Sequence, residues 1–442
     1  MVRFTEYWLM TASLDSATAL LDAAYSGLDF KSGDLFEATA APEEQNQGDW
    51  ITHGGWLTLA EKINADRVFF VDGNPVIVFV KDEPGQANLR HLFNRAWCMA
   101  RPPLLFVAQP GTLSVLDLTQ PPTKDDRGFR ASDCLLQTAN QAAEVQDKLK
   151  DYHRAQIESG RLFEERRFGF EDRADHALIR DLAIVRAKLL DTDLPIQHAH
   201  ALIGQSIFIR YLEDRKILTR DYFKEVAGEN NKWQAILDNA PKHDGATDER
   251  RLYYAAVLSD KAFTHALFLR LAKEFNGDLF PFDADEQKAF TAPRLKLMRE
   301  FLLGQIEGPT LFTFAYDFDI IPIELISSMY EEFLRTEKGK PNTHGSFYTP
   351  GALVEFVLSQ TLNKKVLDGR PRIVDPACGS AIFLVEAFRR LVRHRVCERG
   401  QRLRPDELRK ILREQIAGID VQPEAIRVAA FSLYLALLHY LD

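Results

Sequence analysis

Two acidic residues near the end of the sequence each follow a short apolar run and precede a helix-like pattern. Asp375 ends the run Arg-Ile-Val-Asp and is followed by small residues, whereas Asp420 ends the run Ala-Gly-Ile-Asp. Small residues after a strand let the backbone approach a ligand closely, and the next helix presents unpaired N–H groups. A carboxylate at the end of the neighbouring strand can accept hydrogen bonds from both ribose hydroxyls. Together the two segments predict a crevice for a ribose-containing cofactor.

The segments around these two residues alternate between the patterns of strands and helices. Strands are expected over 372–375 and 416–420, and helices over 351–362, 380–397, 405–415 and 422–441. Strands that alternate with helices are typical of a doubly wound parallel sheet. Asp420 is therefore expected to point into the same crevice as the residues that follow Asp375.

The preceding sequence divides into two further regions. Residues 1–150 are predicted to form an N-terminal α+β domain, in which the β-rich runs 67–81 and 103–118 each contain a hairpin signal. These runs are expected to be successive antiparallel strands of one sheet. Residues 151–340 are predicted to form a helical domain, because apolar residues recur at helical spacing, as over 198–218.

The bulk properties exclude several classes of protein. The chain has 442 residues, 46% of them hydrophobic, which is enough for two or three cores. No apolar run approaches the length of a membrane span and the N-terminus lacks a signal peptide, so we expect a cytoplasmic protein with no membrane contact. A formal charge of −9 argues against a surface covered with phosphate-binding residues. The four cysteines form no Cys-x-x-Cys pair, and the histidines have no ligand spacing, so no metal site is predicted.

Three motifs resemble those of the N6-adenine DNA methyltransferases and occur in the order typical of that family. They are GSFYTP (345–350), DPACGSAIFL (375–384) and GIDVQPEAIRVAAFSLYLALL (418–438). Such enzymes include type I modification subunits, single-chain restriction-modification enzymes and phage-defence methylases. The resemblance is specific over about the last hundred residues, and the segments 203–218 and 327–335 resemble the helical domain that precedes the methylase in these proteins.

The resemblance implies a fold, a cofactor and a partner. Residues 341–442 would form a partial methyltransferase domain, the first half of a Rossmann-like class I sheet, with S-adenosyl-L-methionine as cofactor and DNA as partner. Asp420 would hold the ribose, and Asp375 with its loop would hold the methionine part. The remaining cofactor-binding residues implied by the family are Phe347, Tyr348, Thr349, Pro350, Pro376, Ala377, Cys378, Gly379 and Ser380.

One residue departs from the family pattern. The family usually has Gly-Ser-Gly, whereas this chain has Gly379, Ser380 and Ala381. The added methyl group either narrows the pocket or is absorbed at the start of the helix. Cys378 beside this loop is interpreted as a small packing residue rather than a nucleophile, since no base lies within sequence reach.

The catalytic loop of the family is missing from the sequence. Methylation of adenine at N6 requires a flipped base and an Asn/Asp-Pro-Pro-aromatic loop that polarises the amine. The segment Asn74-Pro75-Val76-Ile77 lacks the second proline and the aromatic residue. We therefore assign no catalytic residue and expect the chain to be inactive alone. It is either an N-terminal fragment or half of a split enzyme whose second polypeptide supplies the catalytic half.

The missing half has a structural consequence, and two other functions stay open. Without neighbouring strands, helix 422–441 is expected to expose Phe431, Leu435 and Leu438. One alternative is a non-catalytic subunit that binds DNA or the cofactor and acts through a partner. The other is a nuclease in residues 1–150, where Asp72 and Lys81 have suitable types.

Two further signals bear on these alternatives. Phe79 stands where a nuclease needs a second acid, which favours a degenerate nuclease-like or unrelated scaffold. The segment 388–414 carries ten Lys/Arg against four acids, and it either meets DNA phosphates or forms a solvated helix face.

Overall fold

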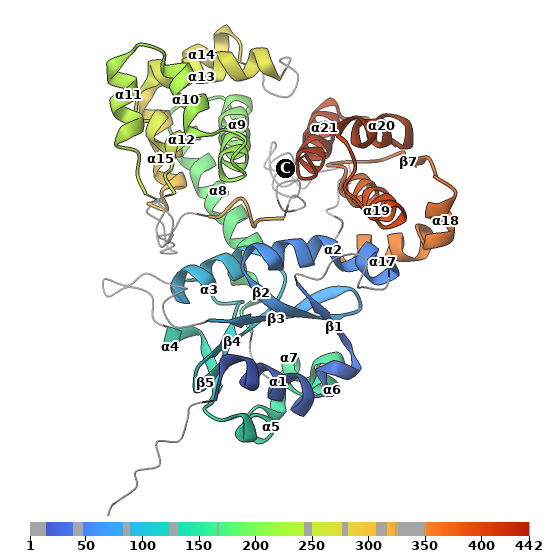
Figure 1. Cartoon of the computed structure of the whole chain (residues 1–442). Helices are drawn as coiled ribbons and strands as arrows, with labels where there is room; N and C mark the ends of the chain where they lie inside the picture. Colours follow the sequence, from blue (N-terminus) through green and yellow to red (C-terminus); the bar gives the residue numbers. More distant parts are fainter. Residues whose placement is uncertain are drawn as a thin grey trace, which may run out of the picture.

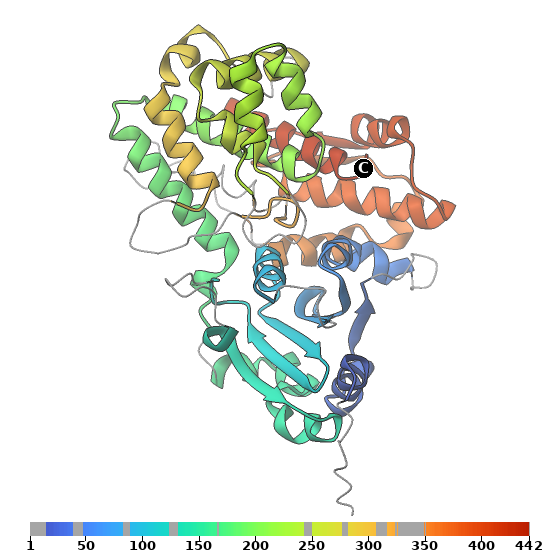
Figure 2. The same cartoon turned by 60° about the vertical axis from the view of Figure 1, so that its left-hand side comes forward.

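The computed structural model of the chain contains one six-stranded sheet, one two-stranded sheet and many helices (Figure 1). It describes residues 15–38, 47–82, 89–122, 131–165, 168–242, 250–275, 282–305, 316–322, 325, 349 and 351–441. Figures 1 and 2 both place the helical region and the C-terminal helices on one side of the six-stranded sheet. Within the described part of the chain, no helix is long and apolar enough to cross a membrane.

The six-stranded sheet is mixed. It contains two hairpins and one further strand at each edge. The strands are β1 (Asp34–Glu37), β2 (Ala65–Val71), β3 (Asn74–Lys81), β4 (Leu104–Gln109), β5 (Thr112–Asp117) and β6 (Leu135–Ala139), paired in sequence order. The β2–β3 and β4–β5 hairpins confirm both predicted turns. The expectation of successive antiparallel strands is wrong at one place, because β3 and β4 are parallel. Helix α3 (Leu89–Cys98) forms the crossover that parallel neighbours require.

Helices cover both faces of this sheet (Figure 1). On one face, Phe79 and Phe106 pack with Phe30, the ring centroids of Phe79 and Phe106 being 5.0 Å apart. On the other face, Val78 packs in the same cluster as Trp97 of α3. The first face is covered by α1 (Ala17–Gly27), α5 (Val145–Lys148), α6 (Arg154–Glu158) and α7 (Arg161–Glu165), and the second by α2 (Gln47–Lys62) and α3. A short α4 (Ala131–Cys134) precedes β6.

The helical region surrounds a central helix, α9 (Ile196–Asp214). All residues from 202 to 215 are buried, so α9 packs on all its sides. The helix predicted over 198–218 is confirmed, although it ends at Asp214. The other helices are α8 (Ala174–Leu190), α10 (Arg220–Ala227), α11 (Asn231–Asp238), α12 (Tyr253–Val257), α13 (Lys261–Glu274), α14 (Ala284–Ala289) and α15 (Ala292–Leu302).

The C-terminal part has the predicted alternation of helix and strand. Strands β7 (Ile373–Asp375) and β8 (Ile416–Gly418) are parallel, and Asp375 lies opposite Gly418. The helices are α17 (Gly351–Thr361), α18 (Lys364–Asp368), α19 (Ile382–Arg399), α20 (Pro405–Gln415) and α21 (Pro423–Leu438). Of these helices, the sequence analysis missed only α18. The division into domains at 150 and 340 stays a prediction, since one apolar cluster runs through all three regions.

The expected exposure of α21 is wrong. Phe431, Leu435 and Leu438 are buried, and the Phe431 ring lies 5.0 Å from that of Phe208 on α9. The helical region therefore covers the side of α21 that the sequence suggested would be open. Exposed apolar residues of the C-terminal part include Val374 of β7, which is 58% exposed, and Val421 after β8, which is 96% exposed.

Candidate cofactor-loop site

Backbone hydrogen bonds tie the loop after β7 to the end of β8. The Ile419 N–H donates to the Asp375 carbonyl at 2.9 Å, and the Cys378 N–H donates to the Ile419 carbonyl at 2.9 Å. The parallel pairing of the two strands thus continues into the loop. This arrangement brings the segments around Asp375 and Asp420 together at the carboxyl ends of their strands, as the sequence predicted.

The carboxylate of Asp420 joins the two segments directly. The Gly379 N–H donates to Asp420 Oδ2 at 3.0 Å, and the Gln422 N–H donates to Asp420 Oδ1 at 2.9 Å. On the other strand, the Ala377 N–H donates to Asp375 Oδ1 at 3.1 Å. An ionised carboxylate offers about four lone-pair positions, so both acids keep capacity for further donors. The assignment of these residues to a cofactor stays a prediction.

The interior of the loop is small and apolar. Cys378 packs with Ala381, Leu384 and Ala429, and the neighbouring Ser380 is also buried. Burial and the carboxylates of Asp375 and Asp420 raise the pKa of the Cys378 thiol to about 11. The thiol is therefore protonated near neutral pH, which favours a packing role over a nucleophilic one. Pro376 and Ala377 are exposed at the rim of the loop.

Two residues of the loop have positive φ angles. Gly379 has φ 50°, and Ala381 has φ 68° and ψ 28° at the N-cap of α19. The Ala381 methyl group is fully buried, so the change from the family's glycine is absorbed at the helix start. The left-handed conformation costs an alanine roughly 1–2 kcal/mol.

Gly418 of β8 permits the close approach of the loop. A Cβ atom at this position would lie 2.8 Å from Leu384 Cδ1 and 2.9 Å from Cys378 Sγ. Such contacts are too short, so a larger residue would push β8 away from the loop. Of the motif expected to close over the cofactor, Phe347, Tyr348 and Pro350 lie outside the described residues. Thr349 is described and partly buried.

The basic segment after the loop is partly an internal ion-pair network. Arg390 and Arg393 of α19 are each 2% exposed, and they pair with Glu355 of α17 and Glu386 of α19, respectively. For these two arginines neither predicted role applies, because they contact neither solvent nor a surface that DNA could reach. Arg413 and other cations of α20 remain exposed.

The nuclease alternative depends on a pairing that the structure does not contain. Asp72 lies in the turn before β3, and Lys81 ends that strand. Lys81 Nζ lies instead 2.7 Å from Asp66 Oδ1, and the Tyr25 hydroxyl donates to Asp66 Oδ2 at 2.7 Å. Phe79 is fully buried, with its ring 5.0 Å from that of Tyr25. An apolar ring therefore stands where a metal-dependent nuclease needs its second carboxylate.

One cluster of metal-ligand types occurs among the described residues, although the sequence spacing predicted none. His394 of α19 lies between Asp368 and Glu398. Its Nε2 is 2.9 Å from Asp368 Oδ1, and its Nδ1 is 4.0 Å from Glu398 Oε2. The two carboxylates face opposite ring nitrogens, so they do not share one nitrogen of His394.

Comparisons with known proteins find similarity to methylases in the C-terminal part of the chain. Residues 322–440 match the family model for N-6 DNA methylases. Over 257 residues the chain is 24% identical to the adenine-specific methyltransferase PglX of Streptomyces coelicolor. The match covers 54% of this chain and 20% of PglX.

Among solved structures, the chain is similar to a cryo-EM structure of a DrdV–DNA complex, at 13% identity and a TM-score of 0.31. That likeness covers 96% of this chain and 38% of the other, and its score is too low to support an argument. The chain thus spans about a fifth of PglX. Over residues 322–440, the chain is similar to the N-6 DNA methylase family.

Proposed function

We propose that the chain is the S-adenosyl-L-methionine-binding and N-terminal part of an adenine-N6 DNA methyltransferase of a restriction-modification or phage-defence system. The hydrogen bond from the Gly379 N–H to Asp420 Oδ2 carries this proposal, because it unites the two predicted cofactor segments. The family match over 322–440 and the similarity to PglX support it.

Each part of the site has a physical role in this proposal. Asp420 would accept hydrogen bonds from the ribose hydroxyls of S-adenosylmethionine with its remaining lone pairs. Asp375 and the loop would orient the methionine part of the cofactor. Helix α19 has no side-chain cap at its N-terminus. Its first-turn N–H groups are therefore suited to a carboxylate such as that of the methionine part. S-adenosylmethionine supplies the activated methyl group.

DNA is the proposed substrate, and the catalytic loop comes from elsewhere. The Asn/Asp-Pro-Pro-aromatic sequence does not occur in residues 1–442. The exposed apolar side chains of Val374, Ile419 and Val421 offer a surface that further parts of a methylase sheet would cover. We therefore propose that the 442-residue chain binds the cofactor but needs a second segment or polypeptide for methyl transfer.

Isothermal titration calorimetry with S-adenosylmethionine tests the cofactor part. Saturable binding is expected for the chain and should weaken at least tenfold in Asp420→Ala, which removes hydrogen bonds to a charged group. Asp406→Ala on α20 is the matched control, since its side chain is 93% exposed and lies outside the loop. Equal binding by both variants would refute the assignment of Asp420.

A methyl-transfer assay tests the second part. Incubation of the chain with tritiated S-adenosylmethionine and DNA is expected to give no labelled adenine. A polypeptide that contains Asn-Pro-Pro-aromatic and binds the chain should restore transfer. Sustained turnover by the purified chain alone would contradict the proposal.

A further inference from the structure

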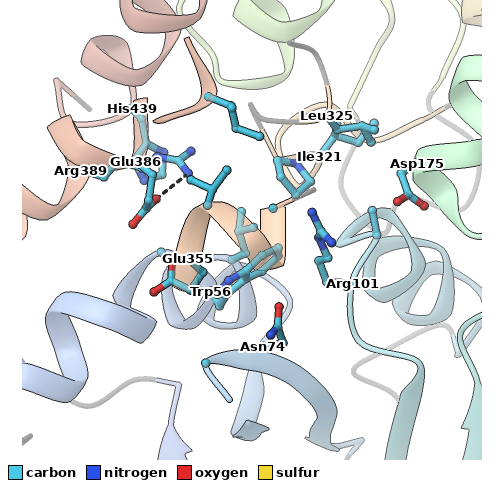
Figure 3. Close-up of a pocket in the computed structure, with 18 of the residues that line it drawn as sticks. Trp56, Asn74, Arg101, Asp175, Ile321, Leu325, Glu355, Glu386, Arg389 and His439 are labelled. Atoms are coloured by element: carbon cyan, nitrogen blue, oxygen red, sulfur yellow. Dashed lines mark ion pairs between the residues drawn. The ribbon is translucent and has the colours of Figure 1, made fainter. Parts of the chain in front are cut away.

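A cavity of about 600 Å³ lies at the junction of the three regions (Figure 3). Its walls come from α2 and the β2–β3 turn, from α8 and the end of α9, and from α17, α19 and α21. Small-molecule sites have volumes of roughly 300–1,000 Å³ and occur preferentially between domains. Neither Asp420 nor any residue from Asp375 to Ala381 lines it, so the cavity is separate from the cofactor loop.

Arg215 is a buried cation in the wall of this cavity. It follows the last residue of α9 and is only 8% exposed. Its Nη1 lies 2.8 Å from His439 Nδ1, and its Nη2 donates to the Asp319 carbonyl at 3.5 Å. Its Cζ lies 4.6 Å from the ring centroid of Tyr211. None of these partners is an anion.

Among the described residues, the guanidinium of Arg215 has neither a counter-ion nor a hydrogen-bond partner for its Nε. No described carboxylate forms an ion pair with it, and its Nε is buried with no hydrogen-bond partner in the described part of the chain. Burial of a cation without a counter-ion is costly, and an unsatisfied buried donor adds to that cost. An anion in the cavity would supply the missing counter-charge.

Arg101 is a second cation for which the described residues provide no counter-ion. It is partly buried and forms no hydrogen bond or ion pair with the described residues. Figure 3 shows it directed into the cavity, on the opposite side from Arg389. The cavity therefore has two arginines, Arg101 and Arg215, that are available to a ligand.

The carboxylates of the cavity are already paired. Asp175 Oδ2 lies 2.6 Å from Arg173 Nη2, and Glu355 pairs with Arg390. Glu386 pairs with Arg393 and lies 3.6 Å from Arg389. The acids thus neutralise other arginines and leave the charge of Arg101 and Arg215 uncompensated.

The surroundings of His439 indicate a positive potential at this end of the cavity. Burial, together with the charges of Arg215, Arg389, Lys62 and Arg393, holds the pKa of His439 well below its usual range. The imidazole is therefore neutral near pH 7. Because Nδ1 faces the Arg215 guanidinium and must accept, the ring presents an Nε2–H donor elsewhere.

We propose that this cavity binds a nucleotide, with its phosphates on Arg215 and Arg101 and its base against the apolar wall that contains Trp56. The fork of guanidinium donors matches phosphate oxygens geometrically. Trp56 is partly exposed and lies with Leu59, Ile321 and Leu325 in the lining, which suits a flat aromatic ring. Because all three regions form the walls, the bound nucleotide stabilises their arrangement.

Fluorescence and calorimetric titrations of the full chain with ATP test this proposal. Saturable binding is expected, with a change in tryptophan emission that is lost in Trp56→Phe. Arg101→Gln and Arg215→Gln should each weaken binding at least tenfold, since each removes charge-assisted hydrogen bonds. Arg413→Gln on the exposed face of α20 is the matched control and should bind as the unaltered chain does. If Arg215→Gln fails to fold, ATP binding by the Arg101→Gln variant tests the proposal, since Arg101 is partly exposed.

Three further titrations identify the ligand chemistry and the site. Pyrophosphate should bind more weakly than ATP, and adenosine should not bind measurably, because the phosphates provide the charge. Saturating S-adenosylhomocysteine and the Asp420→Ala variant should both leave ATP binding unchanged. The proposal is overturned by a folded chain that does not bind ATP, by unchanged binding in Arg101→Gln, or by competition between ATP and S-adenosylhomocysteine.

Discussion

The six-stranded sheet and the β7–β8 pair differ in how their faces are covered. In the first sheet, Phe106 on one face and Val78 on the other are both fully buried beneath helices. In the second, Val374 of β7 is 58% exposed and Val421 after β8 is 96% exposed. The first sheet is packed on both faces, whereas β7 and β8 pack against α19 and are joined by loop hydrogen bonds. The candidate cofactor loop thus follows a pair of strands that is less fully covered than the first sheet.

A matched pair of phenylalanine substitutions gives the largest expected effect. Phe106→Ala should lower the free energy of unfolding by about 3–5 kcal/mol, because it removes a buried ring that contacts Phe30, Phe79 and Tyr152. Phe356→Ala on α17 should change it by less than about 0.5 kcal/mol, since that ring is 63% exposed. Urea denaturation measures both. Equal losses would show that the C-terminal surface is covered in solution.

The second expected effect is a pH dependence of the unfolding free energy, which arises from the ion pairs between α17 and α19. Burial, then the neighbouring Glu386 carboxylate, raise the pKa of Glu355 to about 7. Between pH 4.5 and 7 the folded chain therefore holds a proton that the unfolded chain has lost. The stability contribution of Glu355 is greatest below pH 4.5 and falls as pH rises through 7, by at most about 3 kcal/mol.

Glu355→Gln should flatten the unfolding free energy across this pH window, because the amide does not titrate. Glu414→Gln, at an exposed position on α20, serves as the matched control and should keep the slope of the unaltered chain. If the unfolding free energy of Glu355→Gln changed with pH as steeply as that of the unaltered chain, Glu355 would not be the source of the pH dependence.

A glycine substitution tests how closely the loop must approach β8. Gly418→Ala should destabilise the chain by about 1–3 kcal/mol and weaken S-adenosylmethionine binding, because the new methyl group collides with Leu384 and Cys378. Gly369→Ala, after α18, should have a much smaller effect, since its Cβ would lie 3.3 Å from the Val366 carbonyl oxygen. Thermal denaturation and calorimetry measure the two effects. A neutral Gly418→Ala would contradict the tight packing.

The smallest expected effect concerns Ala381. Ala381→Gly relieves the left-handed strain but removes a buried methyl group, so its unfolding free energy should stay within about 1 kcal/mol of the unaltered chain. Ala387→Gly in the same helix removes a buried methyl group without relieving any strain, so it should lower the free energy of unfolding by about 1–2 kcal/mol. Equal destabilisation by both changes would mean that Ala381 is not strained.

Local signals predicted most of the elements, and contacts between distant segments explain the errors. The Asp72-Gly73-Asn74 turn determines the β2–β3 hairpin from its own residues. The parallel pairing of β3 and β4 depends on how α3 crosses the sheet, which no local pattern records. The burial of Phe431 requires Phe208, a residue far away in the sequence.

The candidate sites show the same division. Asp375, Gly379 and Asp420 could be found because each follows a strand pattern in a motif. Asp66 was missed beside Lys81 because the β2–β3 register contains an irregularity between Ala65 and Arg67. Arg215 had no signal at all, since only the packed structure shows that its guanidinium is buried and that no described carboxylate pairs with it.

Hydrogen–deuterium exchange of the full chain, with and without S-adenosylmethionine, tests the central claim most directly. The cofactor is expected to slow exchange in peptides that cover 375–384 and 416–424, including the Gly379 amide that donates to Asp420. Peptides from the six-stranded sheet should exchange at the same rate in both states. Saturable cofactor binding that protects the first sheet or the walls of the 600 Å³ cavity, and leaves the 375–384 loop unchanged, would contradict the assignment of this loop to the cofactor.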